Sequence, residues 1–234
     1  MSSSFHLSVF TGAGISAESG LSTFRGRGGL WEGHQIEEVA TPGAWQRDSE
    51  RVHSFYNGRR KQLQHVVPNA AHRYLADLQE QLSMEIITQN VDDLHERAGS
   101  QSVLHLHGEL TKVRCSQHED EVFEWGHLPL SCADKAPCGH PLRPHIVWFG
   151  EAVPTYARAL EQVQKADALL IIGSALQVYP AAGLIDEIGP EVPRAYLDPG
   201  DAFLGPSANM YRIQKKATEG LAEIRDWLKK IGAL

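Results

Sequence analysis

The chain has 234 residues, of which 42% are hydrophobic and 22% charged, and its formal net charge is −7. This length suits one main domain with a smaller insertion, and the composition excludes a fibrous or largely disordered protein. The negative charge disfavours a broad phosphate-binding surface, so we expect no direct nucleic-acid partner.

The N-terminal residues contain neither a basic segment nor a long apolar one, so they do not indicate a signal peptide. No later run reaches the roughly 20 apolar residues of a membrane span. We therefore expect a cytoplasmic, monomeric protein with no membrane partner.

Apolar runs predict four strands of a parallel sheet. Residues 6–10 precede Gly12 and residues 168–172 precede Gly173, the pattern of strands buried on both faces. Residues 84–88 and 194–197 indicate two more strands, each followed by polar residues where such a sheet has its ligand crevice.

Two helices are predicted from apolar residues spaced three and four apart. One begins at Pro68-Asn69 and the other lies near the C-terminus. The apolar positions of the two helices are, in order, Ala71, Leu75, Leu78 and Leu82, then Leu221, Ile224, Leu228 and Ile231.

Strands that alternate with helices predict an α/β fold, a Rossmann-like doubly wound parallel sheet with a smaller inserted domain. Residues 1–35, 83–107 and 141–234 are assigned to the Rossmann-like domain. A helical module, residues 36–82, and a polar, cysteine-containing module that resembles a zinc ribbon, residues 108–140, are assigned to the small domain.

Gly12-Ala13-Gly14 follows the first strand, where glycines let backbone amides approach a dinucleotide's diphosphate. Alone this motif is also compatible with a tight turn that binds nothing. Ala17 stands where a Rossmann fingerprint has its third glycine, and no acidic residue ends a clear second strand, which weakens a dehydrogenase interpretation.

Polar residues also follow the strand at 84–88. Gln89, Asn90 and Asp92 bring amides and a carboxylate to a position where a ribose or carboxamide is recognised by hydrogen bonds. His105 and His107 have their imidazoles on one side of an extended segment, although a histidine is often only structural.

Together these motifs resemble those of the sirtuins, in the same order and with similar spacing. The resemblance covers nearly the whole chain and is closest to the bacterial CobB-type enzymes. The segments that carry it are residues 12–16, 24–25, 88–92, 107–108, 142–144, 147–151 and 173–182.

The resemblance implies NAD-dependent removal of acyl groups from protein lysines, giving nicotinamide and O-acyl-ADP-ribose. His107 is implied as the general base that takes a proton from the ribose hydroxyls, a task suited to an imidazole. The positions implied around NAD are Gly12, Ala13, Gly14, Ser16, Phe24, Arg25, Gln89, Asn90, Asp92, Gly173, Ser174, Asp198 and Ala217.

Acylated-lysine proteins or peptides are the implied substrates. Such a peptide would add as a strand between residues 149–151 and 175–178. Tyr56 and Arg59 resemble the Tyr-x-x-Arg element of class III sirtuins, which implies removal of succinyl and malonyl as well as acetyl groups. The implied substrate-binding residues are Ala40, Tyr56, Arg59, Phe149, Gly150, Glu151 and Val178.

Two departures from the sirtuin pattern are visible. Both Cys-x-x-Cys pairs that commonly hold a structural zinc are missing. We predict a Cys₃His set instead, from Cys115, His118, Cys132 and Cys138, with His127 and His140 as rival ligands and reduced thiols as the alternative. Asp198 also stands where many relatives have an Asn that contacts adenosine.

Other functions leave distinguishable traces. An oxidoreductase would produce the absorbance of a reduced cofactor. A module that only binds NAD or acyl-lysine would keep its ligand binding when His107 is replaced by alanine. An ADP-ribosyltransferase would attach a labelled group to protein.

Overall fold

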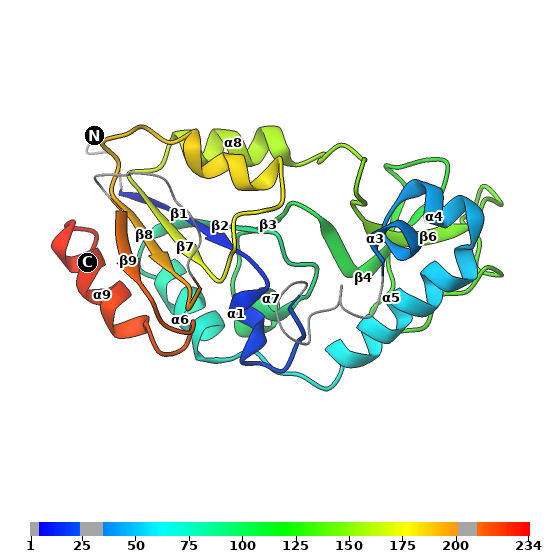
Figure 1. The fold of residues 1–234 in the computed structure, drawn as a ribbon, viewed down its shortest axis with the longest axis horizontal. Helices are drawn as coiled ribbons and strands as arrows, with labels where there is room; N and C mark the ends of the chain where they lie inside the picture. Colours follow the sequence, from blue (N-terminus) through cyan, green and yellow to red (C-terminus); the bar gives the residue numbers. More distant parts are fainter. Residues whose placement is uncertain (1–4, 24–34, 201–209) are drawn as a thin grey trace.

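The computed structural model describes residues 5–23, 35–200 and 210–234. Within these residues, six strands form one all-parallel sheet in the order β3-β2-β1-β7-β8-β9 (Figure 1). This order corresponds to that of a Rossmann fold, which confirms the predicted fold class. The strands are β1 (His6–Thr11), β2 (Ser83–Thr88), β3 (Val103–His105), β7 (Ala168–Ile172), β8 (Arg194–Leu197) and β9 (Met210–Ile213).

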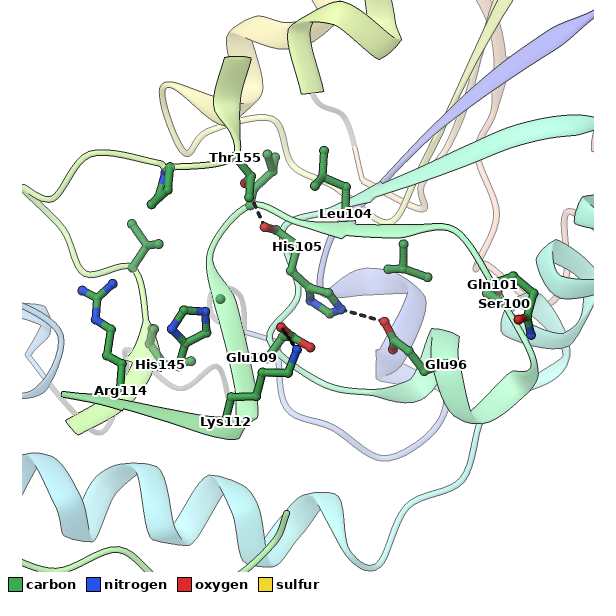
Figure 2. A pocket seen from close by; sticks show the side chains of 16 residues that line it. Glu96, Ser100, Gln101, Leu104, His105, Glu109, Lys112, Arg114, His145 and Thr155 are labelled. Carbon is green, nitrogen blue, oxygen red and sulfur yellow. Dashed lines mark hydrogen bonds and ion pairs between the residues drawn. The ribbon is translucent and has the colours of Figure 1, made fainter. Parts of the chain in front are cut away.

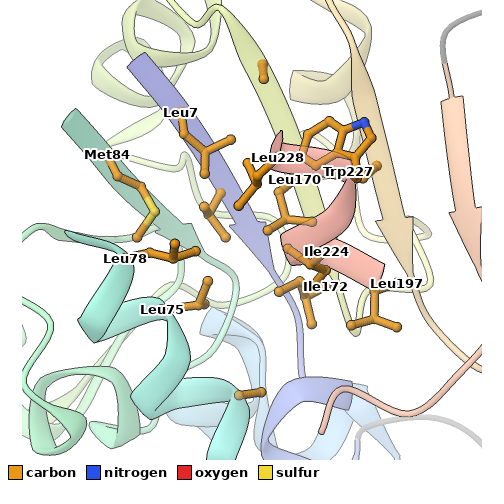
Figure 3. Close-up of a cluster of buried hydrophobic side chains, with 14 of the residues drawn as sticks. Leu7, Leu75, Leu78, Met84, Leu170, Ile172, Leu197, Ile224, Trp227 and Leu228 are labelled. Atoms are coloured by element: carbon orange, nitrogen blue, oxygen red, sulfur yellow. The ribbon is translucent and has the colours of Figure 1, made fainter. Parts of the chain in front are cut away.

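One face of this sheet packs against two helices (Figure 3). The helix α6 (Ala70–Gln79) and the C-terminal α9 (Leu221–Lys230) both carry the predicted apolar stripes. Leu75 and Ile224 from these helices meet alternate residues of the strands, such as Leu170. The side chain of Asn69 caps α6 by accepting from the backbone N–H groups of Ala71 and His72, as the Pro68-Asn69 start predicted.

The opposite face is covered by α8 (Tyr156–Gln164) and a 3₁₀ helix, η1 (Ala181–Asp186). Phe10, Leu169 and Tyr196 from the sheet pack against them. Figure 1 shows α8 and α9 on opposite sides of the sheet. Because both faces are buried, the central strands are apolar almost throughout.

A second, antiparallel sheet has the order β5-β4-β6 and occupies the other end of the molecule (Figure 1). Its strands are β4 (Gly108–Cys115), β5 (Val122–Glu124) and β6 (Leu142–Ile146). Leu142 pairs with Cys115 and Ile146 with Gly108, so this sheet extends past the predicted boundary at residue 140.

Three helices accompany the second sheet: α3 (Ile36–Val39), α4 (Pro42–Arg47) and α5 (Ser49–Leu63). Val52 and Leu63 of α5 share a core with Leu110 and Ile146 of the small sheet. By contrast, α6 packs under the large sheet, so the predicted helical module 36–82 is divided between the two units.

No helix in the described part of the chain is long and apolar enough to cross a membrane.

The strand order of the large sheet reverses direction between β1 and β7, which lie side by side. Their carboxyl ends pack glycine against glycine. A Cβ on Gly12 would lie 2.7 Å from the Gly173 carbonyl oxygen, and one on Gly173 would lie 2.2 Å from the Ile15 nitrogen. A parallel sheet binds ligands at such a switch point, and here the Gly12 and Gly173 backbones pack too closely for a side chain on either residue.

Replacing Gly173 with alanine should destabilise the protein for two reasons, a φ of +63° and the collision with Ile15. Gly126→Ala is the matched control, because Gly126 has a φ of +64° and open space around its Cβ position. In urea denaturation the control should lose about 1–2 kcal/mol. Gly173→Ala should lose roughly 1–3 kcal/mol more. Equal losses would show that the close approach carries no cost.

Candidate active site

The carboxyl ends of four neighbouring strands bring the predicted site residues together. Gly12 follows β1, Gln89 follows β2, and Ser174 stands two residues after β7. His107 lies in the two-residue link between β3 of the large sheet and β4 of the small one. The residues predicted from separate stretches of sequence therefore gather at one edge of the large sheet.

Ser174 and Gln89 are joined across this edge. The Ser174 hydroxyl donates to Oε1 of Gln89 at 2.8 Å. Nε2 of Gln89 is buried and has no partner among the described residues, and neither does the Ala13 backbone N–H. Two free donors beside a glycine-lined turn fit the hydroxyls and diphosphate of a dinucleotide.

Gly12 and Gly14 allow the close packing of this turn, but their backbone N–H groups are already hydrogen-bonded within the protein. Their N–H groups donate to the carbonyls of Ile172 at 3.0 Å and Gly173 at 2.8 Å. These bonds hold the ends of β1 and β7 together. Of the three predicted diphosphate residues, only Ala13 keeps an amide without an acceptor in the described chain.

Asn90, Ser16 and Asp92 form one buried network. Nδ2 of Asn90 donates to the Ser16 hydroxyl at 3.2 Å, which donates to Oδ2 of Asp92 at 3.1 Å. Burial raises the pKa of Asp92, while hydrogen bonds from the Leu94 N–H and from Ser16 oppose that shift. The network fixes the Asn90 amide and the Asp92 carboxyl relative to each other through the Ser16 hydroxyl.

Two buried histidines that the sequence did not single out support this network. Nε2 of His72 lies 3.4 Å from the Ser16 hydroxyl, and Nε2 of His95 lies 3.0 Å from the Thr11 hydroxyl. Burial lowers the pKa of His72 to about 4 and that of His95 well below its ordinary value. Both rings are therefore neutral hydrogen-bonding groups, and only their neighbourhood in space reveals them.

His107 is held by the backbone that precedes Asn90. Its Nδ1 lies 3.1 Å from the Gln89 carbonyl oxygen. Because a carbonyl only accepts, Nδ1 carries the proton and Nε2 carries the free lone pair. Burial lowers the pKa of His107, and the bond to Gln89 only partly offsets that effect. The ring is thus neutral and basic near pH 7.

Gly108 allows His107 to take this position. The φ of Gly108 is +78°, and a Cβ there would lie 2.0 Å from the His145 carbonyl oxygen. The Val147 N–H donates to the His107 carbonyl at 3.0 Å. The backbone on both sides of the imidazole is therefore fixed.

His105 points toward the same segment as His107 but has a different partner. Its Nδ1 lies 2.9 Å from the Asn90 carbonyl oxygen and its Nε2 lies 2.9 Å from Oε1 of Glu96. Burial alone would lower the pKa of His105, but Glu96 and Glu109 raise it. We infer a charged structural pair and not a base.

A cavity of about 450 Å³ opens beside this pair (Figure 2). His105, Glu109 and Lys112 line it, whereas neither His107 nor Gln89 is among the described residues around it. The cavity therefore lies between residues of the two sheets, and Gln89 and His107 do not line it.

The predicted substrate residues divide into two groups. The Phe149 N–H donates to the Ala40 carbonyl at 3.0 Å, and Ala40 and Tyr56 belong to one buried cluster. Burial lowers the pKa of Arg59, while Asp92 and Tyr56 act in the opposite direction, so its guanidinium lies within electrostatic reach of both.

The second group is the loop that follows β6. Gly150 has a φ of +91°, which favours glycine. Glu151 accepts from Arg143 at 2.7 Å and from the Trp148 N–H at 2.8 Å, so its side chain holds the loop in place. Val178 lies half-buried in the segment that follows β7.

The remaining cofactor predictions have different outcomes. Oδ1 of Asp198 accepts from the Gly200 N–H at 2.7 Å, so this oxygen is already engaged in a turn. Ala217 is buried in the core under the large sheet, which leaves only its backbone for a ligand. Phe24 and Arg25 lie outside the described residues.

A metal-binding cluster forms at the far end of the small sheet. One ligand atom from each of four residues lies within 4.8 Å of the others, and the residues are Cys115, His118, Cys138 and His140. Tetrahedral zinc with Zn–S of about 2.3 Å and Zn–N of about 2.0 Å separates its ligand atoms by roughly 3.5–3.8 Å. The Cys115 and Cys138 sulfurs are 3.4 Å apart, so this Cys₂His₂ set fits zinc.

Cys132 is not part of this cluster, which corrects the predicted ligand set. Its sulfur lies 3.3 Å from the Ser49 hydroxyl at the start of α5. Gly139, with a φ of +85°, turns the chain so that His140 faces back toward Cys138. His140, one of the two rival ligands, replaces Cys132.

The chain is similar to known proteins over most of its length. A model described as the Sir2 family matches residues 12–180. An NAD-dependent protein deacylase of Bacteroides thetaiotaomicron is 48% identical over 229 residues, which cover 95% of this chain and 97% of that protein.

Solved structures agree with the sequence comparison. A Sir2 homologue in complex with NAD has a TM-score of 0.86 and 39% identity, and the match covers 97% of this chain and 90% of that one. A Sir2 complex with a deacetylated p53 peptide and 3′-O-acetyl ADP ribose has a TM-score of 0.78 and 27% identity, with 96% and 94% of the chains covered.

The metal cluster predicts which substitutions release zinc. Cys138→Ser or His140→Asn should lower zinc from about one equivalent per chain, measured by elemental analysis, because each removes a ligand. The melting temperature should fall with it. Cys132→Ser is the matched control and should keep its zinc; retention by His140→Asn together with loss by Cys132→Ser would contradict the assignment.

Proposed function

The chain belongs to the Sir2 family and is an NAD-dependent protein deacylase, and we propose that His107 is the general base of its reaction. Its substrates are acylated lysines of proteins or peptides. Bound NAD supplies the ribose carbon that the acyl oxygen attacks and the ribose hydroxyls that lose a proton. The proposal assigns the remaining tasks to residues of this chain.

Cofactor binding is assigned to the residues that follow the carboxyl ends of β1, β2 and β7. The glycine-lined turn and the Ala13 amide would hold the diphosphate. The unpaired Nε2 of Gln89, supported by Ser174, would donate to a ribose hydroxyl. Asn90 and Asp92, fixed through Ser16, would order the ribose and the carboxamide.

The observation that carries the assignment of His107 is the hydrogen bond from its Nδ1 to the Gln89 carbonyl at 3.1 Å. It selects the tautomer whose Nε2 can accept a proton, beside the amide that would hold the ribose. A neutral imidazole with a lowered pKa is ready to act as a base at pH 7.

Acyl recognition is assigned to Ala40, Tyr56 and Arg59. The small side chain of Ala40 leaves room, and Tyr56 and Arg59 are both buried, at 5% and 9% exposure. A guanidinium and a phenol are the groups that recognise a carboxylate, so we propose that succinyl- and malonyl-lysine are substrates together with acetyl-lysine. Residues 149–151 and Val178 would pair with the peptide backbone.

Zinc in the Cys₂His₂ cluster would be structural. The apolar core beneath it is small, with Val113, Leu130 and Leu142 among its few buried members, so a metal would add the missing stability. The cytoplasmic location and the monomeric state expected from the sequence stay predictions.

Replacing His107 with alanine should lower kcat by about 10²–10⁴-fold, because the proton acceptor is lost. Activity is measured as nicotinamide release from NAD and an acetyl-lysine peptide, without the absorbance of a reduced cofactor. His65→Ala, at an exposed position, is the control. A His107→Ala enzyme with ordinary turnover would overturn the assignment.

The pH profile should show when His107 takes up a proton. The pKa of His107 is shifted below its ordinary value of 6.5, and only the neutral ring accepts a proton. The kcat/KM should therefore be constant near pH 7 and fall as the pH drops, with a midpoint below 6.5. A midpoint above that value would contradict the buried, neutral ring.

Arg59→Met should lower the ratio of desuccinylation to deacetylation by roughly 10–100-fold, the loss expected for a hydrogen bond to a charged group. Tyr56→Phe should lower the same ratio by a smaller factor. The measurement compares one peptide that carries acetyl-, malonyl- or succinyl-lysine. Arg51→Met, an exposed arginine of α5, is the matched control, and equal loss of all three activities would refute the pocket.

A further inference from the structure

Trp148 lies directly behind the proposed acyl pocket. Its side chain is 2% exposed, and its indole Nε1 donates to the Tyr56 hydroxyl oxygen at 3.1 Å. The two residues are far apart in sequence, and this bond connects the loop after β6 to α5. None of the roles assigned above uses Trp148.

We propose that Trp148 determines the preference for acidic acyl groups by fixing the Tyr56 hydroxyl as a hydrogen-bond donor. This inference rests on the proposed acyl pocket and adds a positioning residue to it. Trp148 would act through Tyr56 and would not touch the acyl group itself.

The chemistry of the two groups supports this direction. An indole N–H can only donate, so it must use a lone pair of the Tyr56 oxygen. The phenol proton is then left for a second partner. Among the described residues the indole is the one hydrogen-bond partner of the Tyr56 hydroxyl. A carboxylate in the pocket is an acceptor that needs such a donor when it is taken out of water.

Trp148 is itself held from several sides. The guanidinium carbon of Arg143 lies 3.3 Å from the centre of the indole ring, and the ring of Trp45 lies 5.9 Å away. The Trp148 backbone N–H donates to Glu151 at 2.8 Å. Since the ring cannot turn freely, the Tyr56 hydroxyl is oriented before a substrate binds.

Arg143 strengthens the case for an acidic group. Its guanidinium pairs with Glu151 at 2.7 Å and stacks on Trp148, and Tyr56 lies within its electrostatic reach. Arg59 lies on the same helix as Tyr56. The carboxylate of Glu151 acts on the same phenol with the opposite sign, so two guanidinium groups face one carboxylate there, and the remaining positive charge favours an anionic acyl group beside Tyr56.

The experiment compares Trp148→Phe with the unchanged enzyme on acetyl-, malonyl- and succinyl-lysine versions of one peptide. The phenyl ring keeps most of the packing but has no N–H. The ratio of desuccinylation to deacetylation should fall about tenfold, the effect of one hydrogen bond, and mainly through KM for the acidic peptides. In a Tyr56→Phe background, Trp148→Phe should produce no further change in this ratio.

Trp227→Phe is the matched control, because it makes the same change to a buried indole in the core under the large sheet, in a different cluster from Tyr56 and Trp148, and should leave the ratio unchanged. Should Trp148→Phe fold poorly, benzothienylalanine at position 148 replaces only the N–H by sulfur and keeps the shape. An unchanged ratio in either folded variant, or an additional loss in the Tyr56→Phe background, would overturn the role of Trp148.

The outcomes also separate this inference from the pocket on which it rests. If Arg59→Met and Tyr56→Phe lower all three activities equally, the pocket assignment fails. If they lower the acidic activities selectively and Trp148→Phe does not, only the role of Trp148 fails.

Discussion

The hydrogen bond between Nδ1 of His107 and the Gln89 carbonyl connects the two sheets at the position of the proposed general base. His107 occupies the short link from β3 to β4, so any shift of the small sheet would move its ring. Gln89 follows β2 in the large sheet, and its side chain faces Ser174 after β7. The same residue therefore fixes the tautomer of the proposed base and carries the amide that would contact the ribose.

Burial explains which parts of the fold the sequence could predict. The strands β1 and β7 are covered on both faces, so their apolar runs are continuous and end at glycines. The edge strands β3 and β9 are short, and β9 exposes Tyr211. Strand β6 contains Arg143, Pro144 and His145 instead of an apolar run, so its membership of the small sheet shows only in three dimensions.

The metal cluster also shows what could not be predicted from the sequence, here for a binding site. The sequence favours Cys132 and leaves His140 only as a rival ligand, because either residue could close a loop of moderate length with Cys115. The structure separates them through the left-handed turn at Gly139, which places His140 beside Cys138, and through the contact of Cys132 with Ser49. A prediction from sequence would need both the turn conformation and the packing of α5.

The electrostatic environment differs between the two sides of the proposed active site. On the cofactor side, burial disfavours charge: it lowers the pKa of His72 and His107 and raises that of Asp92. On the acyl side, Glu151 is paired with Arg143 and lies near Arg114 at 3.4 Å.

Neutral, desolvated groups suit proton transfer, because a neutral imidazole can accept a proton at pH 7. Guanidinium groups held by a carboxylate suit an anionic acyl chain, because their positions are set before that chain arrives. The proposed function therefore places proton transfer on the neutral side and acyl recognition on the charged side, with Arg59 in electrostatic reach of Asp92 and Tyr56.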